Sequence, residues 1–195
     1  MSVIKLMRII LSMSWSQKLF LKINNMVGKN TLRDKFFYIC GQYLIWVLVV
    51  ACVGSFFVYG RDIVSLGFFA VPTLLAFGFS YGFAYIFPHR RPIVEHPTIT
   101  ELIVPLSTWK SFPSDHTIAA LLLSYGVLLF SGSWVLFLLC LVIAVCVMMG
   151  RVYCGVHYPR DIMGGIVTVA MSIIISYVII VSFLLWYGGS ALQSF

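Results

Sequence analysis

The chain has 195 residues, of which 61% are hydrophobic and only 10% are charged. Soluble domains carry about 25% charged residues, so this composition excludes an ordinary soluble domain, and the length leaves no room for a separate soluble module. The formal net charge of +7 indicates an anionic partner. No basic helix or aromatic-rich sheet pattern points to nucleic acid, which leaves membrane lipid or a phosphate-bearing substrate.

Residues 1–35 form a basic N-terminal segment that we expect to be an amphipathic helix on the membrane surface. It holds seven of the thirteen basic residues, and apolar residues such as Ile9, Trp15 and Phe20 recur between them at roughly helical spacing. A helix of this composition lies in the plane of the interface. No small-residue cleavage site follows an apolar core, so a signal peptide is not expected.

Residues 36–195 form the membrane-embedded domain, in which uncharged stretches predict transmembrane helices of about 20 residues. The stretch 117–150 is too long for one span, and Ser131-Gly132-Ser133 divides it into a hairpin; the last helix is expected to end at Gly188-Gly189. The sequence therefore predicts an all-α membrane protein, with five transmembrane helices in a bundle and an N-terminal amphipathic surface helix. The expected spans are 36–59, 63–87, 114–130, 133–150 and 161–187.

Beyond the N-terminal segment, nearly every ionisable residue falls into two polar segments, 88–116 and 151–161. Their members are His89, Arg90, Arg91, Glu95, His96, Glu101, Lys110, Asp115 and His116 in the first, and Arg151, His157, Arg160 and Asp161 in the second. Because the two helices of the hairpin separate them, both segments should face the same side of the membrane. Charge kept at helix ends on one face of a membrane protein is typical of a functional site.

Each polar segment leads into a helix whose first turn suits phosphate chemistry. Ser114 is suited to be an N-cap, and the free N–H groups at such a terminus bind anions. Pro159 suits the first position of the next helix, which places Asp161 close enough to reach the ring of His157. A carboxylate on one imidazole nitrogen leaves the other nitrogen free to attack.

Together, the two segments supply the groups that phosphoryl transfer needs. Arg91 and Arg151 offer guanidiniums whose fork matches phosphate oxygens. Of His116 and His157, one can attack while the other protonates the leaving oxygen. Either histidine alone is more typical of a structural residue at the membrane interface, but the combination favours catalysis. The histidines lack the spacing of a metal site, so no metal is expected.

These motifs resemble those of the type 2 phosphatidic acid phosphatase superfamily of membrane lipid phosphatases. Its signature has three parts, K-x6-R-P, P-S-G-H and S-R-x5-H-x3-D. Here they read Arg91-Pro92, then Pro113-Ser114-Asp115-His116, then Gly150-Arg151 followed by His157 and Asp161. The third part matches in spacing throughout, and the P-S-D-H variant and the short chain resemble the BcrC-type undecaprenyl-diphosphate phosphatases.

The resemblance implies a role for each matching residue and no metal or other cofactor. His157 would be the nucleophile that becomes a phosphohistidine, Asp161 its orienting partner and His116 the general acid. The phosphate would be bound by Arg91, Ser114 and Arg151.

Three positions depart from the family pattern. The lysine of the first part is replaced by Ala84, and its charge could come from Arg90 or Lys110 or be absent. The glycine of the second part is Asp115, whose carboxylate would lie near the phosphate unless it points away or is protonated. The serine of the third part is Gly150. Arg90, Lys110 and Asp115 are therefore further candidate substrate-binding residues.

The resemblance favours hydrolysis of undecaprenyl diphosphate to the monophosphate, with the polyprenyl tail in membrane lipid. Two alternatives stay open. The same chemistry could act on phosphatidylglycerophosphate, phosphatidate or lipid A phosphate, or the chain could be a non-catalytic lipid-phosphate transporter or scaffold.

The resemblance also implies a bacterial cytoplasmic membrane, with the active site on its outer face. Five spans place the basic residues 1–35 on the same side as the active site, and the positive-inside rule assigns that side to the cytoplasm. We expect the outer face despite this conflict. The sequence does not indicate an oligomeric state.

Overall fold

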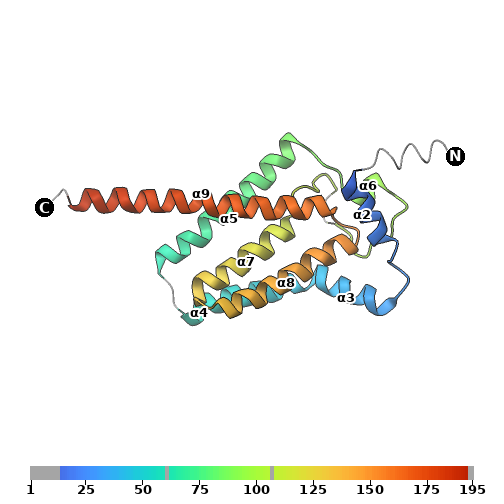
Figure 1. Ribbon diagram of the computed structural model, residues 1–195, viewed down its shortest axis with the longest axis horizontal. Coiled ribbons are helices and arrows are strands. Elements are labelled where there is room, and N and C mark those ends of the chain that lie inside the picture. The colour runs from blue at the N-terminus through green and yellow to red at the C-terminus, as the bar shows by residue number, and fades with distance from the viewer. Residues whose placement is uncertain (1–13, 60–61, 106–107, 193–195) are drawn as a thin grey trace.

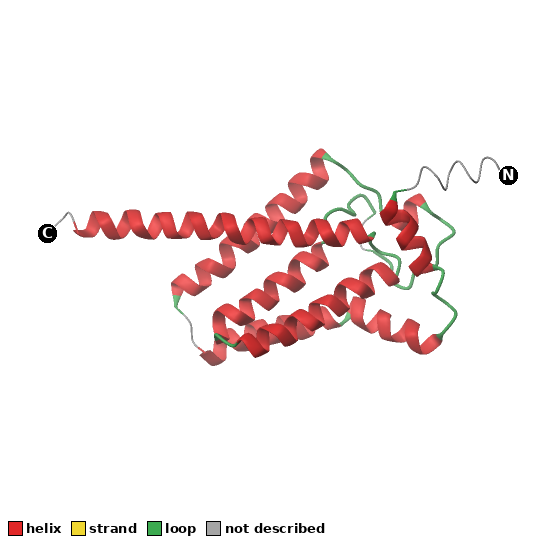
Figure 2. Ribbon diagram, viewed as in Figure 1, coloured by secondary structure: helices red, strands yellow, loops and turns green. Residues whose placement is uncertain are grey.

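The computed structural model describes residues 14–59, 62–105 and 108–192, which form helices and loops without strands (Figures 1 and 2). The helices are α2 (Trp15–Asn24), α3 (Thr31–Gln42), α4 (Leu44–Tyr59), α5 (Ile63–Ile86), α6 (Pro92–Glu95), α7 (Asp115–Ser131), α8 (Trp134–Tyr153) and α9 (Pro159–Leu192). The all-α architecture expected from the sequence is confirmed.

Within the described residues, four apolar stretches are long enough to cross a membrane: α3 with α4 (Thr31–Tyr59), α5, α8 and the part of α9 from Pro159 to Trp186. The chain is a multi-pass membrane protein. Helix α7 is apolar but has only 17 residues. It lies in the middle of the bundle and contacts α4, α5, α8 and α9. A fifth span through α7 stays a prediction.

Short polar caps set the starts of the membrane helices. Asp62 accepts a hydrogen bond from the backbone N–H of Ser65 at the start of α5, and Ser133 does the same for Leu136 at the start of α8. Gly132 ends α7 in the left-handed conformation, with φ of 67°, which glycine adopts without steric cost. The expected turn at Ser131-Gly132-Ser133 is therefore present.

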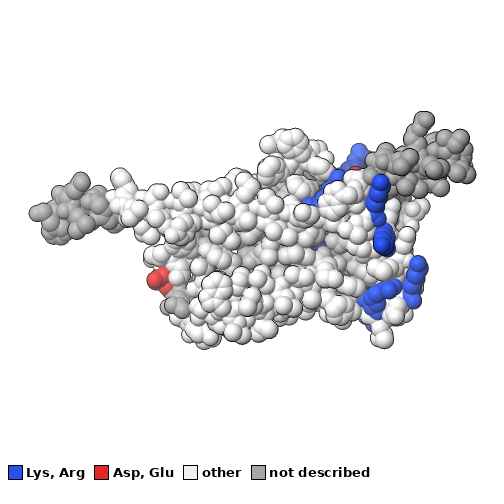
Figure 3. Space-filling model, viewed as in Figure 1, with Lys and Arg blue, Asp and Glu red and all other residues white. Residues whose placement is uncertain are grey.

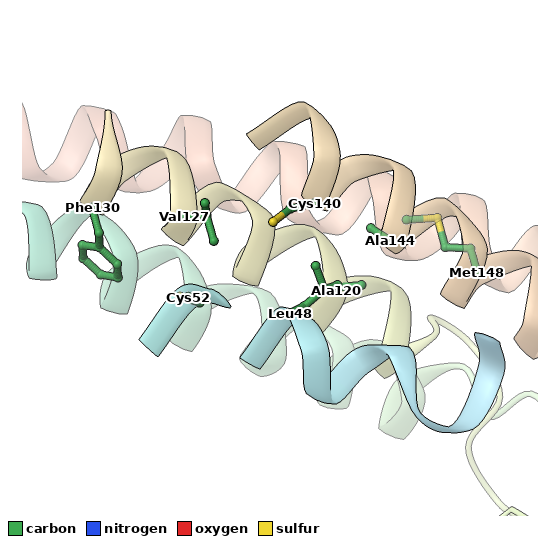
Figure 4. Packing of buried hydrophobic residues seen from close by; sticks show 8 residues of the cluster. All are labelled: Leu48, Cys52, Ala120, Val127, Phe130, Cys140, Ala144 and Met148. Carbon is green, nitrogen blue, oxygen red and sulfur yellow. The ribbon is translucent and has the colours of Figure 1, made fainter. Parts of the chain in front are cut away.

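Small side chains let α4, α7 and α8 pack closely in the centre of the bundle. Figure 4 shows this cluster, to which the small residues Cys52 and Ala120 belong and in which Ala120 lies beside Leu48. A Cβ atom on Gly126 of α7 would come within 2.6 Å of the Cys52 sulfur. Close helix approach through small residues is a common way for membrane helices to associate.

Helix α2 covers the loops at one end of the bundle. The Phe20 ring is fully buried and meets the Tyr158 ring edge-on at 5.1 Å. Asn24 exchanges two hydrogen bonds with the backbone of Thr100. Figure 3 shows Lys and Arg side chains over this end and none over the middle of the visible face.

The segment 1–35 that we expected on the membrane surface is described only from residue 14. Its described part contains α2 and, after a turn, the first residues of α3, which begins at Thr31 with Asn30 as its N-cap. The boundary at 35 thus falls inside α3. A place on the membrane surface stays a prediction for this segment.

One expected helix end is wrong. Helix α9 continues through Gly188-Gly189 to Leu192 and has 34 residues, because two glycines weaken a helix by only about 1 kcal/mol each relative to alanine. At 1.5 Å per residue it is about 51 Å long, and Figure 1 shows it extending well beyond the bundle.

Candidate active site

Hydrogen bonds join the two polar segments directly at the end of the bundle that α2 covers. The Ser111 hydroxyl donates to Asp161 Oδ2 at 2.6 Å, and the Ser114 N–H donates to the Asp161 carbonyl oxygen at 3.0 Å. Arg91 Nη1 donates to the carbonyl oxygen of Val156 at 3.3 Å. Segments separated by the α7–α8 hairpin therefore share one site.

His157 lies in the loop between α8 and α9 and is almost fully buried. Its Nδ1 is 3.5 Å from Asp161 Oδ2, and its Nε2 is 3.4 Å from Arg91 Nη1. A guanidinium has no acceptor, so the contact with Arg91 requires an unprotonated Nε2 and places the proton of the neutral ring on Nδ1. Burial lowers the pKa of His157 to about 4, which keeps the ring neutral at physiological pH.

Asp161 sits in the first turn of α9 and is fully buried. Its Oδ2 accepts from the Ser111 hydroxyl and, at 2.9 Å, from the N–H of Tyr158. These two donors fix the carboxylate beside the His157 ring. The sequence pattern does not indicate this role for Ser111, because a serine in a polar loop can have many partners and only the fold brings it to Asp161.

The start of α7 brings Ser114 and His116 to the same place. Ser114 is the N-cap, and its hydroxyl accepts from the Thr117 N–H. His116, in the first turn, is partly exposed and lies close enough to Arg151, His157 and Arg91 for their charges to act on it. The start of α7 therefore brings His116 within electrostatic range of His157 and of both arginines.

Arg91 and Arg151 each have a buried hydrogen-bond donor that no described residue pairs with. Arg151, in the last turn of α8, is 5% exposed and donates from Nη1 to the carbonyl oxygen of Gly41 at 3.3 Å. The Nε atoms of Arg91 and Arg151 are buried and have no hydrogen-bond partner among the described residues. Buried polar groups are normally paired, so these two donors suit the oxygens of a bound anion.

Two apolar cavities lie beside the candidate active site. One of about 360 Å³ runs between α5 and α9 and reaches Phe112, two residues before Ser114. The other, of about 310 Å³, lies between α2, α3 and α8. In the described part of the chain, no group of three or more His, Cys, Asp or Glu side chains is arranged to hold a metal ion.

Comparison with known families agrees with this geometry. Residues 65–185, which are more than half of the chain and include both histidines, match the model of the PAP2 superfamily. The chain belongs to the PAP2 superfamily. The resemblance drawn from its motifs is thereby confirmed.

Two curated relatives carry undecaprenyl-diphosphatase names. YbjG of Escherichia coli (strain K12), whose assignment is itself provisional, is 34% identical over 97 residues, which are 50% of this chain and 48% of YbjG. Undecaprenyl-diphosphatase BcrC of Bacillus subtilis (strain 168) is 32% identical over 90 residues, 45% of this chain and 44% of BcrC. The matched part thus spans about half the length of each relative.

Two solved PAP2-type structures share the fold. Aquifex aeolicus LpxE superposes with a TM-score of 0.67 at 22% identity, over 85% of this chain and 96% of that one. The Bacillus subtilis phosphatidylglycerolphosphate phosphatase superposes with a TM-score of 0.55 at 20% identity, over 86% and 87% of the two chains.

Gly150, which stands where the PAP2 motif has serine, lies where the backbones of α3 and α8 come very close together. A Cβ atom on Gly150 would lie 2.3 Å from the Gly41 nitrogen. The same approach brings the Gly41 carbonyl oxygen to Arg151. Glycine at this position therefore lets α3 hold the arginine that the PAP2 motif places next.

Lys110 and Asp115, the other departures from the PAP2 pattern, contact one another. The Lys110 ammonium also donates to the Ser80 hydroxyl at 2.7 Å. Ser80 and Ala84 lie one turn apart on the same face of α5, and helical side chains lean toward the N-terminus. The Lys110 ammonium thus occupies the region that a lysine at position 84 would reach.

Arg90 stands apart from this arrangement. It is exposed, and no hydrogen bond or ion pair links it to the site within the described residues. Of the two cations considered as substitutes for the missing lysine, Lys110 is the one that the fold brings to the site.

Proposed function

We propose that the chain is a membrane phosphatase that hydrolyses undecaprenyl diphosphate to undecaprenyl phosphate through a phosphohistidine. One observation carries the proposal: Nε2 of buried His157 lies 3.4 Å from Arg91 Nη1, and the Nε donors of Arg91 and Arg151 are buried without a hydrogen-bond partner among the described residues. A neutral nucleophile and preplaced cations are what attack on a phosphate requires. The names of the two curated relatives favour the diphosphate substrate.

In the proposed first step, His157 Nε2 attacks the terminal phosphorus and the bond from phosphorus to the bridging oxygen breaks. The bridging oxygen keeps the electron pair and takes a proton from His116, whose ring becomes protonated when the anionic phosphate binds beside it. Arg91 moves from Nε2 to the phosphate oxygens, where it acts with Arg151 and the free N–H groups at the start of α7. Asp161 stabilises the charge that the His157 ring gains.

In the proposed second step, water attacks the phosphorus of the phosphohistidine. His116, now unprotonated, takes a proton from this water, and the N–P bond breaks to restore neutral His157. Inorganic phosphate leaves. Each group returns to its starting protonation state, so the cycle consumes one water and needs no other reactant.

The apolar cavity between α5 and α9 suits the polyprenyl tail. It meets the site at Phe112, and a Cβ atom on Gly164 would lie only 2.2 Å from the Phe112 ring. The Phe112 side chain is therefore packed tightly against α9, between the cavity and the proposed phosphate-binding turn at the start of α7. A tail held there would leave the headgroup at the start of α7.

We also propose that the active site faces outward from a bacterial cytoplasmic membrane, as the resemblance to BcrC-type enzymes implies. The basic α2 lies at the same end and opposes this orientation under the positive-inside rule. Thr98, exposed in the loop after α6, offers a test. In Thr98→Cys, labelling of intact cells by a membrane-impermeant maleimide supports the outer face, and labelling only after lysis reverses the orientation.

The function is tested by phosphate release from purified protein with a panel of lipid phosphates. Undecaprenyl diphosphate should be the best substrate, and His157→Ala and His116→Ala should each abolish release. Faster turnover of phosphatidylglycerophosphate, phosphatidate or lipid A phosphate would replace the substrate and keep the chemistry. Binding of lipid phosphate without turnover by the wild type would indicate a transporter or scaffold instead.

A further inference from the structure

A buried ion pair lies at the start of α7, beside the proposed phosphate site. The Lys110 ammonium contacts Asp115 Oδ1, and Ser80 of α5 donates to the same oxygen at 2.9 Å. The ammonium also lies 4.2 Å from the centre of the Tyr81 ring. The Lys110 side chain is 4% exposed, whereas the Asp115 side chain is 34% exposed.

The pair stands next to the groups that handle the leaving oxygen. Asp115 immediately precedes His116, the proposed general acid, and follows Ser114, the N-cap of α7. The charges of Lys110 and Asp115 both act on groups of the site, since each interacts with Arg91. The ammonium therefore lies within electrostatic range of Arg91, the proposed phosphate-binding arginine.

A carboxylate at this position has a cost for any phosphatase. It repels the substrate and competes for the positive end of the α7 dipole, which favours anions. Lys110 cancels that charge while the two side chains are paired, and the carboxylate in turn stabilises a buried ammonium that would otherwise be poorly solvated. An incoming phosphate group can replace Asp115 as the partner of Lys110 without burying new charge.

We propose that Lys110 and Asp115 select diphosphates over monoesters by reserving the Lys110 ammonium for the phosphate group of the leaving product. This inference rests on the proposed function. When His157 attacks a diphosphate, the leaving group is a phosphate that stays anionic after His116 protonates the bridging oxygen, and a nearby cation stabilises this charge. When it attacks a monoester, the leaving alcohol is neutral once His116 protonates it, so Lys110 stays paired with Asp115 and contributes little.

The test compares farnesyl diphosphate with farnesyl phosphate, which share one tail. Lys110→Met keeps the apolar stem and removes the charge. It should lower kcat/KM for the diphosphate by about tenfold more than for the monoester. Asp115→Asn should also reduce this preference, because it frees the Lys110 ammonium to bind the single phosphate of the monoester and so raises kcat/KM for the monoester. Equal losses on both substrates in Lys110→Met would overturn the inference.

Lys110→Met leaves Asp115 unpaired and could unfold the protein, so the double variant Lys110→Met/Asp115→Asn provides a neutral cluster with a similar shape. It should fold and should also have lost the preference for the diphosphate. A folded double variant with the wild-type preference would contradict the inference.

A binding measurement separates this inference from the proposed hydrolysis. Wild type should bind a non-hydrolysable farnesyl methylenediphosphonate at least about tenfold more tightly than farnesyl phosphonate, and Lys110→Met should remove that difference. This result needs no turnover, so it stands even if the wild type hydrolyses neither farnesyl ester. Equal affinities for the two phosphonates in the wild type would sink the inference, whatever the enzyme hydrolyses.

Discussion

Arg91 Nη1 lies 3.4 Å from His157 Nε2, the nitrogen that attacks phosphorus in the proposed mechanism. The same guanidinium also holds the Val156 carbonyl oxygen, next to His157 in the chain. Arg91 therefore both fixes the loop that carries His157 and contacts the lone pair of Nε2. Binding of a phosphate would draw the guanidinium onto the phosphate oxygens and free Nε2 in one movement.

Arg91→Lys should lower kcat/KM by about 100-fold, because an ammonium cannot hold the Val156 carbonyl oxygen and two phosphate oxygens with one planar fork. The measurement is phosphate release from undecaprenyl diphosphate. Arg90→Lys provides the control, since Arg90 is exposed and has no link to the site among the described residues. Its loss should stay below about threefold. Similar losses in the two variants would contradict the geometry.

Ser111→Ala should lower kcat by about tenfold with little change in KM. The variant removes a 2.6 Å hydrogen bond to buried Asp161, which leaves that carboxylate less firmly placed beside His157. A hydrogen bond to a charged group contributes roughly 1.5–3 kcal/mol, and only part of that should appear in the rate. Steady-state kinetics checks this prediction, and unchanged kcat would show that the Tyr158 N–H alone positions Asp161.

His157 should make the folded protein sensitive to acid. The folded pKa is about 4 and the unfolded value about 6.5, so the unfolded chain binds a proton in this window that the folded protein does not. The contribution to stability is complete above about pH 6.5 and is lost as pH falls toward 4. Thermal unfolding in detergent at about pH 5 and pH 7 should show a larger loss for wild type than for His157→Gln.

The same shift predicts how activity depends on pH. Since His157 stays neutral down to about pH 4, the nucleophile should not cause kcat/KM to fall near pH 6.5, where an ordinary histidine becomes protonated. A profile of kcat/KM against pH for the wild type tests this. An acidic limb at pH 6.5 that disappears when Asp161 is replaced would show that the His157 ring is more solvated than its burial indicates.

Gly150→Ser restores the serine of the PAP2 motif and should nevertheless destabilise the protein. Its Cβ atom would lie 2.3 Å from the Gly41 nitrogen, which is backbone and cannot rotate away. Overpacking commonly costs about 1–3 kcal/mol, and a backbone contact belongs at the upper end. Thermal unfolding in detergent should show a lower midpoint. Gly54→Ser is the control, because nothing lies within 4 Å of a Cβ atom there.

Sequence patterns predict the helices and their caps well where the cause is local. Long apolar stretches predicted α5 and α8 to within a few residues, and Ser114 is the expected N-cap because capping depends only on the next three residues. Pro159 begins α9 as expected, which puts Asp161 beside His157. These predictions succeed because their causes lie within one or two turns of helix.

Contacts between distant parts of the chain cannot be predicted from the sequence alone. Nothing in the pattern indicated that Lys110 would pair with Asp115 against Ser80, or that Gly150 would meet the backbone of Gly41. Likewise, α2 is held to the site by Phe20 against Tyr158, which a surface-helix pattern does not suggest. Such contacts follow from how helices pack, which a single sequence does not specify.

Trapping the phosphorylated enzyme tests the central claim most directly. Wild type mixed briefly with undecaprenyl diphosphate labelled in its terminal phosphate, then quenched in alkali, should carry a base-stable and acid-labile phosphate on His157. The label should be absent from His157→Ala. Release of labelled phosphate by a wild type that never carries the label on His157, or release at the full rate by His157→Ala, would contradict the account.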